Sequence, residues 1–340
     1  MSKNIDVLGI GNAIMDVITP VPDVFLGPNN IAKGGMTLID EGTALGLHKA
    51  FKTAGKGREV AGGSAANTLV GIAQLGVRAA YFGKVADDPI GARFSKGMQE
   101  AGVDFRTRPS KAKNGKGGAA TARCLIAVTP DGERSMSTFL GASTAFEKRD
   151  LVDSMIKSAK VIYLEGYLFD SDAAKKAFVH AAEVTAKAGN KVALTLSDSF
   201  CVDRHRASFK HLVENHVDIL FANEAEILSL FETDRIDTAL DALAKSGKVA
   251  CITRSEKGSV IQDAIRRYHV PAVPLAKFGV TKPVDTTGAG DQYAAGVLAG
   301  HAMGLGWQDA GHLGSLCAAE VISHYGARPE QSIHELAQKF

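Results

Sequence analysis

A glycine-rich segment in the last quarter of the chain combines residue types that can bind a phosphate and accept a proton. It reads Val284-Asp285-Thr286-Thr287-Gly288-Ala289-Gly290-Asp291 and precedes an expected helix. Unpaired N–H groups at a helix start attract anions, and glycines let a phosphate approach the backbone closely. Asp291 follows directly, where a carboxylate can accept the proton of a hydroxyl group. The segment is a candidate phosphoryl-transfer site, although taken alone an ordinary glycine turn before an early-helix acid explains it more simply.

A second glycine-rich segment, Ala61-Gly62-Gly63-Ser64-Ala65-Ala66-Asn67, precedes a run with helical periodicity. The run ends at Gly76, a residue typical of helix C-termini. Small residues at the start of this helix would let a ligand lie against it, and Asn67, one turn in, could reach that ligand with its amide. The alternative is tight packing between helix and sheet, which requires the same small residues.

Polar side chains follow two of the expected strands. Asn12 and Asp16 come after the first strand of the chain, and Asn223 and Glu226 come after a later one. Ligands of parallel sheets collect at the carboxyl ends of strands, and carboxylates near a phosphate suit Mg²⁺ held mostly through water. The alternative for Asn12 and Asp16 is a strand-end turn. For Asn223 and Glu226 it is a helix cap with an early-turn acid.

Strand-like and helix-like segments alternate along most of the chain. The alternation predicts an α/β fold with a central, mostly parallel sheet flanked by helices. The expected strands span 5–10, 79–85, 161–168, 191–196, 217–222 and 248–253. The expected helices span 41–53, 89–101, 171–188, 224–231 and 236–244, together with the one that the pair Gly62-Gly63 opens and Gly76 ends. Because no internal repeat or interdomain linker interrupts the pattern, we expect a single domain over residues 1–340.

Two less regular excursions, about residues 13–60 and 104–142, depart from this alternation. The first contains several prolines, and the second is rich in Lys, Arg and Gly before two β-like runs. The turn Pro130-Asp131-Gly132-Glu133 between those runs predicts a β-hairpin. We expect the two excursions to form a small β lid above the main sheet.

The composition argues against several classes of protein. A formal net charge of +2 over 340 residues argues against a nucleic-acid partner. No apolar run is long enough to span a membrane, and no signal-peptide core is present at the N-terminus. Four widely spaced cysteines indicate a reducing cytoplasm. The P-loop, protein-kinase, metalloprotease and hydrolase motifs are absent, and the dinucleotide fingerprint is only half-imitated because Ile14 occupies its third glycine position.

The two glycine-rich segments together resemble the signatures of the ribokinase, or PfkB, family of carbohydrate and nucleoside kinases. Ala61 to Gly76 resembles the first signature and Asp285 to Val297 the second, and the likeness extends over nearly the whole chain. The resemblance implies a ribokinase-like fold, ATP as phosphoryl donor and Mg²⁺. By the same likeness, a monovalent cation such as K⁺ would lie near Asp285.

The resemblance also implies a role for each matching residue. Asp291 would be the base, ionised because a helix start favours its carboxylate. Arg134 would bring a positive charge onto the phosphate. The other expected positions are Gly288, Ala289 and Gly290 as an anion hole; Asn12, Asp16, Gly62, Gly63, Ser64 and Asn67 as acceptor contacts; Asn223 and Glu226 around phosphate and magnesium; and Thr253, Gly258 and residues 318–326 beside the ATP base and ribose. Taken alone, residues 253–258 fit an ordinary β-turn.

Within the family, the N-terminal third is most similar to the adenosine kinase branch. The pattern Gly11-Asn12-x-x-x-Asp16 and the long insert before residue 60 fit that branch, whereas Thr287 stands where eukaryotic-type members tend to have Asn. The resemblance implies phosphorylation of adenosine to AMP. The alternatives are inosine or guanosine, a sugar such as ribose or fructose, and a non-catalytic nucleoside-binding protein. We expect a cytoplasmic monomer or homodimer that acts on a small molecule and binds neither nucleic acid nor membrane.

Overall fold

The computed structural model describes residues 4–111 and 118–338, and its larger sheet has nine strands. These strands are β1 (Ile5–Ile10), β5 (Ala79–Phe82), β6 (Val103–Phe105), β9 (Ala159–Glu165), β10 (Lys191–Thr195), β11 (Ile219–Asn223), β12 (Val249–Thr253), β13 (Ser259–Gln262) and β14 (Arg267–Val270). Their spatial order is β14-β13-β12-β11-β10-β9-β1-β5-β6. Neighbouring strands are parallel from β12 to β6, whereas β13 is antiparallel to both of its neighbours, β12 and β14. The predicted α/β fold with a mostly parallel sheet is confirmed.

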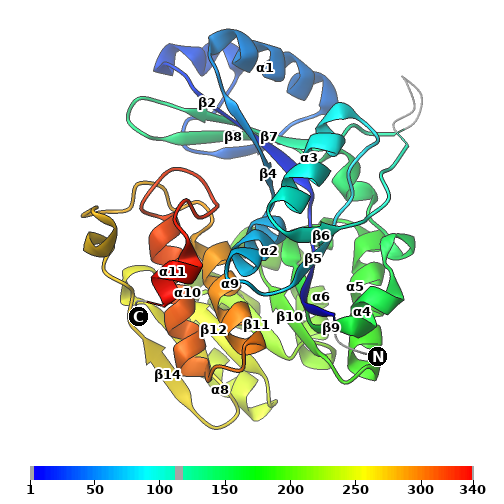
Figure 1. Ribbon diagram of the computed structural model, residues 1–340, viewed down its shortest axis with the longest axis vertical. Coiled ribbons are helices and arrows are strands. Elements are labelled where there is room, and N and C mark those ends of the chain that lie inside the picture. Colours follow the sequence, from blue (N-terminus) through cyan, green and yellow to red (C-terminus); the bar gives the residue numbers. More distant parts are fainter. Residues whose placement is uncertain (1–3, 112–117, 339–340) are drawn as a thin grey trace.

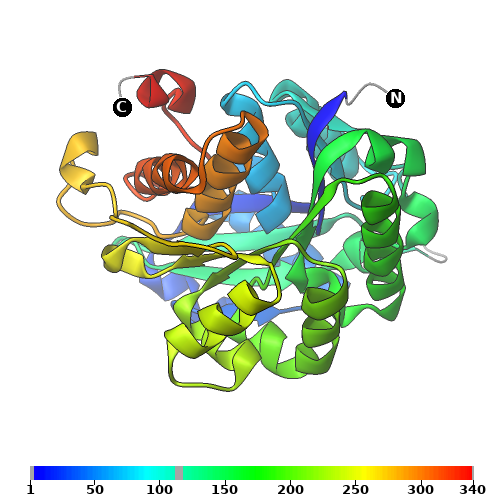
Figure 2. The same ribbon diagram turned by 90° about the horizontal axis from the view of Figure 1, so that it is seen from below.

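Helices cover both faces of this sheet (Figure 2). One face packs against α2 (Ser64–Gln74), α3 (Pro89–Glu100), α9 (Ala289–Ala302), α10 (Trp307–Val321) and the short α11 (Ile333–Ala337). The other packs against α4 (Asp153–Ser158), α5 (Asp172–Lys187), α6 (Ser199–Asn215), α7 (Glu224–Phe231) and α8 (Ile236–Lys245). Successive strand residues enter opposite cores: Val7 and Tyr163 pack on the α2 side, Leu8 and Ile162 on the α5 side. Strands buried on both faces are mostly apolar, which is why β1 is hydrophobic apart from Asp6, whose carboxylate accepts hydrogen bonds from Arg78.

A second sheet lies above the first, next to α1 (Glu41–Ala54) (Figure 1). Its strands are β2 (Ile14–Pro20), β3 (Met36–Leu38), β4 (Arg58–Gly62), β7 (Ala122–Val128) and β8 (Arg134–Phe139), in the order β3-β8-β7-β2-β4. The predicted hairpin is the antiparallel pair β7–β8. The sequence did not predict β2, β3 or β4, which are short or lie among prolines. Residues 112–117 of the expected lid lie outside the described residues.

The structure departs from the sequence predictions at α6 and at the end of β9. Helix α6 was not predicted: it contains few apolar residues and a non-helical residue, His205. Asp198 caps its N-terminus, where the carboxylate accepts a hydrogen bond from the Cys201 N–H at 2.6 Å. Strand β9 ends at Glu165, three residues before the predicted end, because residues 166–170 form a 3₁₀ turn.

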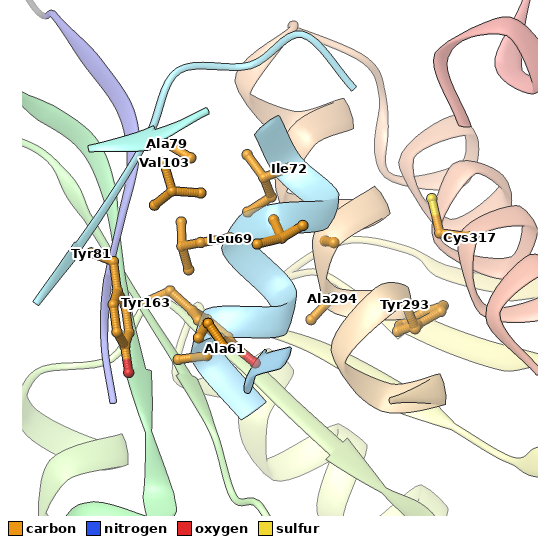
Figure 3. Close-up of a cluster of buried hydrophobic side chains, with 14 of the residues drawn as sticks. Ala61, Leu69, Ile72, Ala79, Tyr81, Val103, Tyr163, Tyr293, Ala294 and Cys317 are labelled. Atoms are coloured by element: carbon orange, nitrogen blue, oxygen red, sulfur yellow. The ribbon is translucent and has the colours of Figure 1, made fainter. Parts of the chain in front are cut away.

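Helices α2 and α9, which follow the two glycine-rich segments, pack directly against each other (Figure 3). Leu69 and Ile72 of α2 and Ala294 of α9 lie in one buried cluster. The two helices approach closely at Gly71, where an added Cβ would lie 2.2 Å from Gln292 Oε1 and 2.8 Å from the Ala295 Cβ. The small residues of α2 therefore serve helix packing as well as the helix start.

Substituting Gly71 with alanine should lower the free energy of unfolding by about 1–3 kcal/mol, because the methyl group overlaps side chains of α9. Gly46 offers a matched control, since it lies in the exposed interior of α1 with no atom within 4 Å of an added Cβ. Gly46→Ala should raise stability by about 0.5–1 kcal/mol through helix propensity and reduced chain entropy. Urea denaturation measures both, and equal effects would contradict the close contact between α2 and α9.

Candidate active site

The glycine-rich turn at the start of α9 leaves several backbone donors free. Gly288 precedes the helix with φ 80°, a left-handed conformation, and an added Cβ would lie 2.7 Å from atoms of Ala327. Among the described residues, no group accepts a hydrogen bond from the amides of Gly288, Gly290 or Asp291. The amide of Ala289 donates to Thr286 O at 3.2 Å. Free amides at the positive end of a helix form an anion-binding site.

Asp291 lies in the first turn of α9 and faces the start of α2. Its carboxylate accepts hydrogen bonds from Ser64 Oγ at 2.6 Å and from Asn67 Nδ2 at 3.4 Å. Burial raises the pKa of Asp291 to about 6, although the Ser64 and Asn67 bonds oppose the rise. Burial thus opposes the ionised form that a helix start favours, and it shifts the pKa of Asp291 upward without bringing it above neutrality. The side chain remains mostly ionised at pH 7 and is a stronger base than an exposed aspartate.

Arg134, at the start of β8, extends from the small sheet to the glycine-rich turn. It forms a buried ion pair with Asp285, which also accepts hydrogen bonds from the amides of Gly326 at 2.9 Å and Thr287 at 3.0 Å. Burial disfavours the charge of Asp285, but these bonds and the guanidinium hold its pKa below the usual value. The Nε–H of Arg134 is buried and has no acceptor among the described residues. Arg134 therefore has a donor left for an anionic ligand.

The glycines before α2 allow its start to lie against the first strands. An added Cβ at Gly63, whose φ is 99°, would lie 2.1 Å from the Asn12 carbonyl oxygen. At Gly62 it would lie 2.2 Å from Asp16 Oδ2. The packing alternative therefore applies to both glycines, and that packing brings Asn12 and Asp16 beside α2.

Glu165, at the end of β9, is a buried site residue that the sequence analysis missed. It accepts hydrogen bonds from Asn12 Nδ2 at 3.0 Å, from the Asn12 amide at 3.2 Å and from the Ala65 amide at 2.8 Å. Burial raises its pKa to about 7 against these bonds. Glu165 thus fixes Asn12 and the start of α2. Glu165 could have been found from the sequence, because it is a carboxylate at the end of a strand that is otherwise apolar.

Asp16, on β2, faces a small cavity of about 140 Å³. Asn67, Arg134 and Arg328 line the same cavity. Burial raises the pKa of Asp16 to about 7; the charges of Arg328 and Arg134 oppose the rise, and the charge of Asp291 adds to it. Among the described residues, no group donates a hydrogen bond to the Asp16 carboxylate. A larger cavity of about 800 Å³ shares part of the lining of the small one: Ile18, Arg58, Arg134, Gly326 and Glu330.

Asn223 and Glu226 cap helix α7 at the carboxyl end of β11. Asn223 Oδ1 accepts a hydrogen bond from the Glu226 amide at 2.8 Å, and Glu226 Oε2 accepts one from the Asn223 amide at 3.0 Å. The helix-cap alternative is therefore correct, whatever else the two residues bind. Among the described residues, no group of three or more His, Cys, Asp or Glu side chains could hold a metal ion by itself.

Thr253 and Gly258 lie where β12 turns into β13. Residues 255–257 form a 3₁₀ turn, and Gly258 adopts φ 81° before pairing resumes at Ser259. An added Cβ at Gly258 would lie 2.1 Å from the Val270 carbonyl oxygen. The turn alternative is thus correct for this segment. No hydrogen bond among the described residues joins Thr253 or Gly258 to Asp291.

The loop after α10 closes over the start of α9. Glu320, fully buried in α10, accepts hydrogen bonds through Oε1 from the amides of Glu330 at 3.0 Å and Gln331 at 2.9 Å. Gln292 Nε2 donates to the carbonyl oxygens of Asn67 at 3.1 Å and Ala327 at 3.0 Å. The buried side chains of Gln292 and Glu320 therefore fix residues 326–331 beside Asp291. No periodicity in the sequence indicated this position of the loop.

Free amides, a carboxylate of raised pKa and a buried arginine are the components of a phosphoryl-transfer site. The comparisons agree, since a model of the pfkB family of carbohydrate kinases matches residues 37–333. A solved adenosine kinase from Sinorhizobium meliloti is 45% identical, with a TM-score of 0.86, over 98% of this chain and 99% of that one. A probable sugar kinase protein from Rhizobium etli CFN 42 is 43% identical, with a TM-score of 0.87, over 100% and 99%.

Among curated relatives, probable fructokinase-3 of Arabidopsis thaliana is 27% identical over 249 residues, 70% of this chain and 68% of that protein. The chain belongs to the pfkB family of carbohydrate kinases, and the resemblance of its two glycine-rich segments is confirmed. It is a kinase with a ribokinase-like fold. Within residues 4–111 and 118–338, no helix is both long and apolar enough to cross a bilayer.

Proposed function

We propose that this kinase transfers the terminal phosphoryl group of ATP to the 5′-hydroxyl of adenosine, forming AMP and ADP. The observation that carries the proposal is the Asp291 carboxylate, held by Ser64 and Asn67 beside the free amides of the glycine-rich turn. The choice of adenosine is supported by the 45% identity to the solved adenosine kinase over 98% of the chain. It is also supported by the adjoining cavities, which offer room for a base beside a sugar.

In this mechanism the acceptor oxygen attacks the terminal phosphorus, and the bond to the bridging oxygen of ADP breaks. Asp291 accepts the hydroxyl proton as the new bond forms. The amides of Gly288 and Gly290 and the guanidinium of Arg134 stabilise the charge on the phosphoryl oxygens. Asp16 and Asn67 hold the acceptor. The five-stranded sheet acts as a lid that excludes water, which would otherwise compete as acceptor.

Magnesium fits the acidic group at the carboxyl ends of β10 and β11. Burial raises the pKa of Glu226 to about 7, against the Asn223 N–H, and the charge of Asp198 adds to the rise. A nearby cation would relieve this unfavourable charge. Asn223 and Glu226 would hold Mg²⁺ mostly through water, and the ion would supply charge neutralisation on the ATP phosphates.

Acidification should reduce activity because the base and the acceptor-binding carboxylate both gain protons near neutrality. Burial raises the pKa of Asp291 to about 6 and that of Asp16 to about 7. Because both carboxylates are required in the deprotonated form, kcat/KM should be close to full at pH 8, fall about tenfold per pH unit between the two pKa values and fall more steeply below both. A pH profile from 5 to 9 measures this. The residual activity of Asp291→Asn should no longer fall with the titration of Asp291 and should keep only the fall due to Asp16. A flat wild-type profile would contradict the role of Asp291 as the base.

A pfkB-type sugar kinase is the second candidate, favoured by the relatives named as sugar kinase and fructokinase. A coupled assay of ADP release with adenosine, inosine, guanosine, ribose and fructose separates the candidates. We expect the highest kcat/KM with adenosine, and acceptor-dependent ADP release by Asp291→Asn that is about 10²- to 10⁴-fold slower than that of the wild type. A higher kcat/KM with ribose or fructose would overturn the choice of adenosine. Acceptor binding without any ADP release would indicate a non-catalytic binding protein. Replacing K⁺ with a bulky organic cation in the same assay tests the expected monovalent cation.

A further inference from the structure

Arg328 carries a largely buried charge that no carboxylate of the described residues neutralises directly. Its Nε donates to Asn67 Oδ1 at 3.3 Å, and its Nη2 lies 3.6 Å from the sulfur of Met98. Burial lowers the pKa of the guanidinium to about 10, and the charge of Asp16 opposes that shift. Arg328 thus remains charged at pH 7 with donors to spare. A desolvated charge without full hydrogen bonding is unfavourable unless a ligand supplies the missing partners.

The backbone of Arg328 is held in place by the contacts of neighbouring residues in its loop. It lies between Ala327, whose carbonyl accepts from Gln292, and Pro329, which restricts the backbone of the residue before it. Glu320 holds the loop just beyond. A side chain presented by a fixed loop can discriminate between ligands because little conformational freedom is lost on binding.

Asp16 and Arg328 line the same small cavity with opposite charges and no hydrogen bond between them. A hydroxyl group between the two can donate to the carboxylate and accept from the guanidinium at once. Two adjacent hydroxyls on a sugar ring can each make this pair of bonds, because the carboxylate has two oxygens and the guanidinium several N–H groups. A ring that lacks one hydroxyl leaves buried charged groups without a partner.

We infer that Arg328 is a substrate-binding residue that, together with Asp16, selects acceptors carrying two adjacent hydroxyl groups, such as the 2′,3′-diol of a ribonucleoside. The inference rests on the proposed function, since it assumes that the acceptor occupies this cavity. It adds a specificity determinant from the loop after α10. Met98 and Asn67 hold the guanidinium before the acceptor binds.

The test compares adenosine with 2′-deoxyadenosine as acceptors for the wild-type chain, Arg328→Met and Arg328→Lys. The wild type should prefer adenosine by about 100-fold or more in kcat/KM, as expected of a site built to bind the missing hydroxyl. Arg328→Met should lower kcat/KM for adenosine by about 100-fold, mainly through KM, with only a few-fold change for the deoxy compound. Arg328→Lys, which keeps the charge but loses the planar donor group, should recover only part of the preference.

A second cationic residue provides the matched control. Arg267 on β14 pairs with Asp237 and Asp241 at 2.5 and 2.8 Å, on the exposed edge of the large sheet. Arg267→Met should change neither acceptor's kinetics. Thermal unfolding of each variant identifies any loss of folded protein. An equal fall for both acceptors in Arg328→Met would overturn the inference and leave Arg328 a structural residue.

The outcomes also separate this inference from the proposed function. If the wild type phosphorylates ribose or fructose but not adenosine, the nucleoside assignment is wrong. The role of Arg328 is then tested by comparing kcat/KM for that sugar with kcat/KM for its deoxy analogue. If the wild type phosphorylates adenosine and the preference survives in Arg328→Met, the inference about Arg328 alone is wrong. Calorimetric titration of the full chain with adenosine and 2′-deoxyadenosine gives the ratio of dissociation constants without turnover, and this ratio should fall in Arg328→Met as the preference in kcat/KM does.

Discussion

Replacing Asp291 with asparagine should lower kcat by about 10²- to 10⁴-fold, the contribution typical of a positioned general base. An asparagine side chain can still accept a hydrogen bond from Ser64, so the geometry of the turn should persist. It cannot take up the hydroxyl proton at neutral pH. Because Asp291 does not hold the donor in the proposed mechanism, the KM for ATP should change little. Steady-state ADP release at saturating acceptor measures the effect.

Ser64→Ala provides the control for this variant. It removes the 2.6 Å hydrogen bond to Asp291 but leaves the carboxylate. Since that bond stabilises the ionised form, its loss should shift the acid limb of the pH profile upward and reduce kcat at pH 8 far less than Asp291→Asn does. Turnover by Asp291→Asn close to that of the wild type would exclude the residue as the base.

Arg134→Met should reduce both catalysis and stability. The side chains of Arg134 and Asp285 are 10% and 5% exposed, so removing the arginine leaves a buried carboxylate without its partner. Breaking such a pair from one side costs about 3–5 kcal/mol. Loss of the guanidinium from the transferring phosphate should also lower kcat by about 10²–10³-fold.

A double-mutant cycle separates the two effects. Asp285→Asn in the Arg134→Met background removes the orphaned charge and should restore part of the free energy of unfolding, measured in urea. It should leave kcat low, because no cation returns to the phosphate. Recovery of kcat together with stability would show instead that Arg134 acts only by neutralising Asp285.

The parts of the fold predicted from the sequence are those marked by local chemistry. Glycines bracket α2 and precede α9, and β1 is apolar at every position except Asp6, so these elements were predicted within a few residues. Helix α6 lacks such signals because it contains few apolar residues and its helical geometry breaks at His205. The short strands of the small sheet depend on pairing with distant partners, which a local pattern does not encode.

Residues of the candidate site likewise differ in whether local sequence signals or tertiary contacts determine their positions. Asp291, Ser64 and Asn67 were recognisable because each follows a glycine-rich segment at a helix start. Arg328 was not, because it lies in a loop whose place is decided by tertiary contacts with α9 and α10. Glu165 falls between the two cases: its position at the end of a buried strand was visible, but its hydrogen bonds to Asn12 required the fold.

The bridge that Gln292 forms between Asn67 and Ala327 also has a consequence for synthesis on the ribosome. A nascent polypeptide can assemble most of the large sheet once β14 has emerged, about sixty residues before Arg328 emerges. Until Arg328 emerges, Gln292 and Glu320 lack their hydrogen-bond partners in residues 327–331, and the cavity beside Asp16 lacks the part of its lining that this loop supplies. Stabilisation by bound substrate acts only on chains that can bind it. Bound substrate therefore cannot stabilise the earlier folding intermediates, whose resistance to proteolysis and aggregation depends on the burial of their apolar core.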